Sequence, residues 1–279
     1  MWSPRSLRFV NGEIHPAGLS GPSPQGYRRL ALLVHGFNND ECQAKTSYHA
    51  LLDRLRGRGI DAILDQVWEF YWPGYVESRL PPVRPVQEQG TDSALTSFLT
   101  YSLQVPKAVR AGDALAEFLV KLNGPDGQPT EFIFIAHSLG CRVVLQTVRA
   151  LAQAGIAGAN RIPAICLMAA AVPTYMVEYL SQYWWAAHYP TQSFVLYSRK
   201  DFVLKAFFPP GQTFAREGHW PEAVGRWGQP AQVWTARDET MLGHTEYYAS
   251  PVTTSHLLRL FGVATAKNLP EFHPLPWTP

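Results

Sequence analysis

One serine of the sequence occupies a position where a side chain could do chemistry. In the stretch FIFIAHSLGC an apolar strand runs directly into a helix, and the turn between them is made on Ser138. Ala136 and Gly140, two residues before and two after it, are small, as the close approach of strand and helix at such a turn requires. The hydroxyl would stand at a helix N-terminus, where the dipole favours developing negative charge. The pattern indicates a nucleophile or, as the alternative, a serine that only caps the helix.

A second turn could supply the groups that hold such a negative charge. The residues VHGFNN at 34–39 follow a predicted buried strand, and in open α/β sheets sites form at the carboxyl edge. Their His-Gly turn would present the backbone N–H of Phe37 to the site. Together with the N–H of Leu139, which follows the serine, it would form a two-donor oxyanion hole. The alternative is an ordinary turn built from glycine and asparagine.

A parallel sheet is needed to bring these turns together, and the chain predicts one. Apolar runs at 30–35, 131–136 and 162–169 are typical of strands buried on both faces. Strands alternating with helices imply a mostly parallel sheet with helices on both of its faces. We expect further strands or arms at 7–14, within 61–71, at 194–197 and at 232–235, and helices at 41–56, 106–122, 139–154 and 254–261. Residues 73–104 carry four prolines and little periodicity, which indicates an insertion or a long loop.

Composition bounds the class of protein. A length of 279 residues and a hydrophobic content of 46% fit one α/β domain with a large core. A net charge of +2 gives no reason to expect nucleic acid or an anionic membrane as partner. Three widely spaced cysteines match neither a disulfide framework nor a zinc pattern, which favours a reducing cytoplasm. The sequence contains no signal peptide pattern, no apolar run of membrane-spanning length and no metal or nucleotide motif, so we expect no cofactor and no stable membrane insertion.

Taken together, these motifs resemble the α/β-hydrolase superfamily. The matching pieces are VHGFNN at 34–39, IAHSLG at 135–140, SRKDFVL at 198–204 and LGHTEYY at 242–248. Their order is that of the superfamily: oxyanion strand, nucleophile, acid, histidine. The opening is similar to that of an uncharacterised bacterial branch with an HG[FY]NN motif. Ala136 stands where the superfamily usually has glycine, and we interpret it as tolerated because alanine has the next smallest side chain.

The resemblance implies an acid for the site. It points to Asp201, a few residues after the strand expected at 194–197. Asp238 and Glu239 follow the next expected strand and are the competing candidates. Any of these carboxylates could serve, because the role needs only a hydrogen bond to an imidazole that fixes its tautomer.

The resemblance also implies a histidine near the C-terminus, in a loop before the last helix. His244 fits this place, and His219 is the alternative. His256 lies within the expected helix, where a packed or surface role is more typical. Cys141, on the helix after the serine, is expected to be a small buried hydrophobic residue and not a nucleophile.

Two aromatic-rich segments, 73–104 and 173–192, could cover the site as lids. The second contains Tyr175, Trp184 and Trp185, which we expect to bind substrate if they form an aromatic lid over an apolar pocket. The alternative is that these aromatic side chains pack on the core. Such walls would fit a substrate with an apolar part and would leave its acyl length and alcohol open.

The expected protein is one α/β-hydrolase domain over residues 1–279, with a core at 28–262 and a proline-rich tail at 268–279. What the resemblance implies is a serine hydrolase, most simply a carboxylesterase or lipase-like enzyme acting on a small-molecule ester through an acyl-enzyme. An amidase or peptidase with the same triad is the first alternative. A non-catalytic binding protein on the same fold is the second, because a fold does not by itself give a function. The sequence leaves the oligomeric state open.

Overall fold

The computed structural model describes residues 5–17, 28–37, 39–59, 67–74, 91–122, 127–154 and 162–261. Within these ranges eight strands form one sheet in the order β2-β1-β4-β3-β5-β6-β7-β8. Six of its seven neighbouring pairs are parallel, which is the mostly parallel sheet that the sequence predicts. The strands are β1 (Arg5–Val10), β2 (Glu13–Ala17), β3 (Arg29–Val34), β4 (Val67–Tyr71), β5 (Glu131–His137), β6 (Ala164–Met168), β7 (Gln192–Tyr197) and β8 (Ala236–Glu239).

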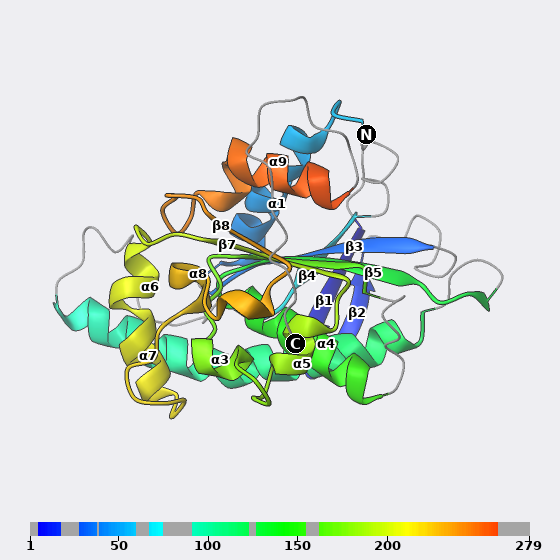
Figure 1. Ribbon diagram of the computed structural model, residues 1–279. Helices are drawn as coiled ribbons and strands as arrows, with labels where there is room; N and C mark the ends of the chain where they lie inside the picture. Colours follow the sequence, from blue (N-terminus) through cyan, green and yellow to red (C-terminus); the bar gives the residue numbers. More distant parts are fainter. Residues whose placement is uncertain are drawn as a thin grey trace.

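Helices cover both faces of this sheet (Figure 1). On one face lie α1 (Glu41–Leu55) and α9 (Pro251–Leu260), and on the other lie α3 (Thr91–Val120), α4 (Gly140–Gln153) and α5 (Trp184–His188). The shorter helices are α6 (Phe202–Ala206), α7 (Phe208–Phe214) and α8 (Val224–Trp227), with 3-10 turns η4 (Thr174–Val177), η5 (Ala231–Val233) and η6 (Tyr247–Ala249). No helix in the described part of the chain combines the length and the hydropathy needed to cross a bilayer.

The order of the strands determines where a site can form. After β3 the chain crosses to β4 on one side and then to β5 on the other, so the direction of winding reverses between β3 and β5. Connections that leave these two strands diverge, which opens a crevice at the carboxyl ends of the strands. The turn at His35 follows β3 and Ser138 follows β5, so both lie at this reversal point.

The N-terminal strand is a hairpin and not the single strand or arm expected at 7–14. β1 and β2 pair antiparallel around Asn11 and Gly12, whose φ angles are 53° and 95°. Asparagine and glycine are the residues that tolerate positive φ at both centres of a two-residue hairpin turn. The dipeptide therefore carried a turn signal that the apolar pattern of the segment concealed.

The helix expected at 106–122 begins much earlier, at Thr91. Proline is favoured in the first turn of a helix, which is why Pro106 suggested a start, yet here it lies inside α3. Tyr101, Val105 and Ala108 are buried and share one face of the helix, so the packed face continues across the proline. Of the lid segment expected at 73–104, residues 91–104 are thus part of this core helix, and 75–90 lie outside the described residues, as does the tail at 268–279.

The strand expected at 232–235 is also displaced. Its first residues form the turn η5, and the strand of this region is β8, Ala236–Glu239. Val233 and Trp234 are apolar because they are buried in the core from the turn, not because they belong to a strand. β8 lies at the edge of the sheet, where half-buried polar residues such as those of ARDE are tolerated.

Candidate active site

Ser138 stands on a strained turn between β5 and α4. Its φ angle is 53°, in the left-handed region that residues other than glycine rarely adopt. Three main-chain hydrogen bonds hold the turn: the Ser138 N–H donates to the carbonyl of Met168 at 2.9 Å, and the Ser138 carbonyl accepts from the N–H groups of Cys141 and Ala171, each at 3.1 Å. A Cβ atom on Gly140 would lie 2.3 Å from the carbonyl oxygen of His35, so only glycine fits there. The glycine two residues after the serine thus lets α4 approach the turn at 35–37, which we call the oxyanion turn because its Phe37 N–H is the expected oxyanion donor.

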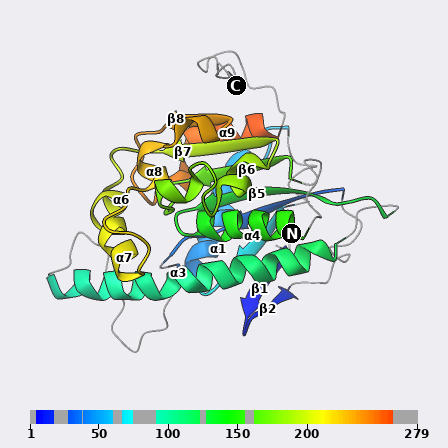
Figure 2. The same cartoon turned by 60° about the horizontal axis from the view of Figure 1, so that its bottom comes forward.

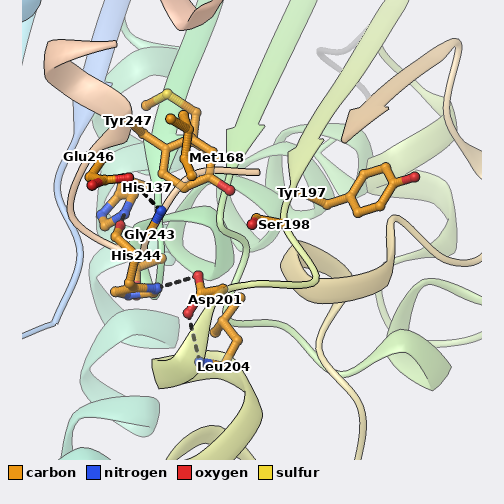
Figure 3. A network of polar contacts seen from close by, with 12 residues as sticks. His137, Met168, Tyr197, Ser198, Asp201, Leu204, Gly243, His244, Glu246 and Tyr247 are labelled. Atoms are coloured by element: carbon orange, nitrogen blue, oxygen red, sulfur yellow. Dashed lines mark hydrogen bonds and ion pairs between the residues drawn. The ribbon is translucent and has the colours of Figure 1, made fainter. Parts of the chain in front are cut away.

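The structure brings Ser138, His244 and Asp201 into one chain of hydrogen bonds. Ser138 Oγ lies 2.9 Å from Nε2 of His244, and Nδ1 of the same ring lies 2.7 Å from Oδ2 of Asp201. Figure 3 shows the ring of His244 directed at the carboxylate. Because a carboxylate only accepts, Nδ1 carries the proton and Nε2 is left to accept from the serine hydroxyl. This is the tautomer that a general base for Ser138 needs.

Asp201 is fixed by a second contact at its other oxygen. Oδ1 accepts the backbone N–H of Leu204 at 2.9 Å, which caps α6 (Figure 3). The side chain is fully buried, and both carboxylate oxygens have partners. A buried charge held in this way keeps one orientation toward the imidazole.

The competing acids, Asp238 and Glu239, have other partners, and the competing base, His219, is exposed. Asp238 pairs with His256 at 2.8 Å, and Glu239 lies 3.7 Å from Arg199. Both belong to β8 itself and do not follow it. His219 is exposed in the loop after α7.

Cys141 has the environment of a structural thiol. It is buried, its Sγ lies 3.5 Å from the carbonyl of Met168, and burial raises its pKa well above the ordinary range. A thiol in such surroundings stays protonated and is a poor nucleophile.

His137, the residue before Ser138, holds the backbone of His244. His137 Nε2 lies 2.6 Å from the backbone carbonyl of His244. Burial, with a smaller contribution from His244, lowers the pKa of His137 to about 3, so its ring is neutral and Nε2–H donates. The loop is held further by Gly243 N–H, which donates to Glu246 at 2.6 Å. His244 is therefore positioned through its main chain as well as its ring.

The two backbone donors expected for an oxyanion hole are free. In the described part of the chain, neither Phe37 N–H nor Leu139 N–H donates a hydrogen bond to another protein group. A Cβ atom on Gly36 would lie only 2.7 Å from Cβ of Ser138, so the turn that carries Phe37 is in direct contact with the serine. An oxyanion that develops next to the Ser138 hydroxyl requires N–H donors that have no other acceptor.

Aromatic side chains from α3 and α7 lie beside the oxyanion turn. The ring of Phe37 meets that of Tyr101 edge to face at 5.5 Å, and Tyr101 contacts Phe208 at 6.4 Å. Gln212 donates to the Tyr101 hydroxyl at 2.8 Å. Figure 2 shows α7 beside one end of the long helix α3. Sequence reasoning missed this wall, although the apolar run FFPPG soon after Asp201 could have suggested it.

The aromatic residues expected to bind substrate are not seen in contact with the triad. Trp184 contacts Tyr179, Trp185 and His188, and Trp185 is 60% exposed. Tyr175 lies against Gly218, where an added Cβ would be 3.1 Å from its ring. A role of Tyr175, Trp184 and Trp185 in substrate binding stays a prediction.

A buried ion pair joins the segment after α7 to α4, the helix that follows Ser138. Arg142, one turn after Ser138 on α4, is 1% exposed and donates through both terminal nitrogens to the carboxylate of Glu217. Its guanidinium also lies 5.8 Å from the ring centre of Tyr183. Nothing in the local sequence pairs these residues, which are 75 positions apart.

Two buried histidines predict a loss of stability in mild acid. Burial lowers the pKa of His35 to about 4 and that of His137 to about 3, whereas a histidine of the unfolded chain titrates near 6.5. Below about pH 6.5 the unfolded chain therefore takes up protons that the folded chain does not. The free energy of unfolding should fall by up to about 1.4 kcal/mol per pH unit for each histidine, until the folded-state pKa is reached.

Urea unfolding in steps from neutral pH to about pH 4.5 measures this slope. His137→Gln should reduce the slope, and His219→Gln, at an exposed position, should leave it unchanged. Equal slopes for the unsubstituted protein and His137→Gln would show that His137 is not held neutral.

The chain is similar to one family of proteins and to several solved structures. A family model described as "Alpha/beta hydrolase family" matches residues 31–276. Among solved structures, a Pyrococcus furiosus esterase is 12% identical, with coverage of 85% of this chain and 83% of that chain and a TM-score of 0.40. A type II thioesterase of the yersiniabactin biosynthetic pathway is 12% identical, with coverage of 87% and 96% and a TM-score of 0.42. A Thermus thermophilus protein is 14% identical, with coverage of 86% and 90% and a TM-score of 0.39. No curated protein sequence matches the chain.

Proposed function

Because the chain belongs to the alpha/beta hydrolase family, we propose that it is a serine hydrolase that cleaves a carboxylic ester through an acyl-enzyme. The observation that carries this proposal is the continuous path of hydrogen bonds from Ser138 through His244 to Asp201, at 2.9 Å and 2.7 Å. The family alone does not fix the chemistry, because a fold can host several functions. This path supports Ser138 as the nucleophile, His244 as the base and Asp201 as the acid.

In the proposed reaction Ser138 Oγ attacks the acyl carbon while its proton passes to Nε2 of His244. Asp201 stabilises the imidazolium that forms, and the N–H groups of Phe37 and Leu139 donate to the oxyanion. When the tetrahedral intermediate collapses, the bond to the alcohol oxygen breaks, and His244 gives its proton to that oxygen. A water molecule, deprotonated by His244, then attacks the acyl-enzyme, and release of the acid returns the proton to Ser138.

The proposed substrate has an apolar part. Phe37 supports this, because its half-buried ring belongs to the oxyanion turn and packs edge to face on Tyr101, which in turn contacts Phe208. Ligand sites are mostly apolar with a few polar groups, and the partly exposed ring of Phe37 would contact the portion of the ester that lies next to its carbonyl. Tyr175, Trp184 and Trp185 could extend such a wall outward if the segment around α5 closes on the substrate.

Turnover of matched esters and amides tests the proposal. Nitrophenyl esters with short, medium and long acyl chains should be hydrolysed, and nitroanilides of the same acids should be hydrolysed much more slowly. A chelator should have no effect, because the described residues hold no cluster of three potential metal ligands. Amide turnover equal to ester turnover would favour an amidase instead. Absence of any turnover across the panel would favour the non-catalytic binding protein.

A further inference from the structure

We propose that His35 is a positioning residue, which holds the Gly36–Phe37 peptide so that its N–H, and not its carbonyl, is available to the oxyanion. This inference rests on the proposed function, because it concerns how the oxyanion hole of that reaction is formed. It assigns a task to a buried side chain that the triad chemistry does not use.

The first observation is the hydrogen bond from the ring to its own turn. His35 Nδ1 lies 2.9 Å from the carbonyl oxygen of Gly36, and both groups are buried. In a trans peptide the C=O and the N–H of the same plane point in opposite directions. A ring that fixes the Gly36 carbonyl on its own side therefore fixes the Phe37 N–H on the other side.

The second observation determines which ring nitrogen carries the proton. The backbone N–H of Trp72 donates to His35 Nε2 at 3.3 Å, so Nε2 acts as the acceptor. Burial lowers the pKa of His35 to about 4, which leaves one proton on the ring at neutral pH. That proton is then on Nδ1, where it donates to the Gly36 carbonyl.

The third observation is that contacts with Trp72 hold the ring. The indole of Trp72 stacks on the imidazole, with ring centres 5.7 Å apart and planes 17° apart. Trp72 Nε1–H also donates to the carbonyl of His35 at 2.8 Å. Trp72, in the turn after β4, thus contacts both the ring and the main chain of His35.

The fourth observation concerns space on the other side of the carbonyl. A Cβ atom on Gly74 would lie 2.9 Å from the Gly36 oxygen, so the turn after β4 closes on the same peptide. Rotation of this peptide would leave the buried Nδ1–H of His35 without an acceptor. It would also direct a carbonyl toward the developing negative charge, which opposes catalysis.

The test compares two substitutions of the same side chain. His35→Phe keeps a flat ring and removes the donor, whereas the amide nitrogen of His35→Asn can donate from close to the position of Nδ1. We expect His35→Phe to lower kcat for ester hydrolysis by about tenfold to a hundredfold with little change in KM, by comparison with the loss of an oxyanion donor. His35→Asn should recover most of this loss. Affinity for a trifluoromethyl ketone, which mimics the tetrahedral intermediate, should fall in parallel with kcat.

The outcomes separate this proposal from the proposed function. If the unsubstituted protein hydrolyses no ester, the proposed function fails first. If it is active and folded His35→Phe retains full kcat, or His35→Asn loses as much as His35→Phe, the positioning role is overturned. Should His35→Phe not fold, nitrogen NMR of the unsubstituted protein decides: a proton on Nδ1 of His35 is expected, and a proton on Nε2 overturns the proposal.

Discussion

Replacement of Ser138 by alanine should lower kcat for ester hydrolysis by about a thousandfold or more, with the protein still folded. The residue supplies the atom that forms the acyl-enzyme, and alanine has no atom to take its place. Loss of the hydroxyl also removes the partner 2.9 Å from Nε2 of His244, so the base has no proton to accept. The effect should appear in kcat rather than KM, because the substrate still meets the same walls.

The fold should survive this change, since the turn at residue 138 is held by main-chain bonds to Met168 and Ala171 that alanine keeps. Thermal unfolding checks this. Cys141→Ala is the matched control three residues further on, at a buried thiol, and it should retain activity within several-fold. If Ser138→Ala stays active while Cys141→Ala is inactive, Ser138 is not the nucleophile and the thiol of Cys141 becomes the candidate nucleophile.

Replacement of Asp201 by asparagine should reduce kcat by about a thousandfold to ten-thousandfold. The substitution keeps the volume and removes the charge that faces the imidazolium. If the amide group presents N–H to Nδ1 of His244, the ring is driven to the tautomer with its proton on Nε2, which cannot accept from Ser138. Stability should change little, because asparagine also caps a helix well and can still accept from Leu204 N–H.

Asp238→Asn is the matched control for this prediction. Asp238 pairs with His256 on α9, and its side chain is 42% exposed, so its charge is paired and screened by solvent. We expect a loss of less than about tenfold, read from kcat on the same ester. A greater loss for Asp238→Asn than for Asp201→Asn would move the acid to β8 and leave the serine as nucleophile.

The elements that could be predicted are those whose signal is local. The turn at Ser138 is encoded by five consecutive residues, from Ala136 to Gly140. The buried strands β3, β5 and β6 read as continuous apolar runs because both of their faces are covered. Asp201 and His244 needed the resemblance as well, since a carboxylate or an imidazole in a loop has no periodicity of its own.

What could not be predicted depends on contacts between distant segments. α3 continues on the N-terminal side of Pro106, where Tyr101 and Val105 are buried, although local propensity would place a proline at a helix end. β8 is a short polar edge strand whose apolar neighbours Val233 and Trp234 belong to a turn. The aromatic wall at Phe208 was likewise invisible, because it exists only where α7 meets α3.

The most direct test of the central claim is to identify the residue that a fluorophosphonate modifies. This reagent phosphonylates an activated serine and needs the same nucleophile, base and oxyanion donors as ester hydrolysis. The protein is treated with the reagent, digested, and mapped by mass spectrometry, while ester turnover is followed in parallel. We predict one adduct, on Ser138, that forms in step with the loss of activity. An adduct on another residue, or full loss of activity with Ser138 unmodified, would contradict the account.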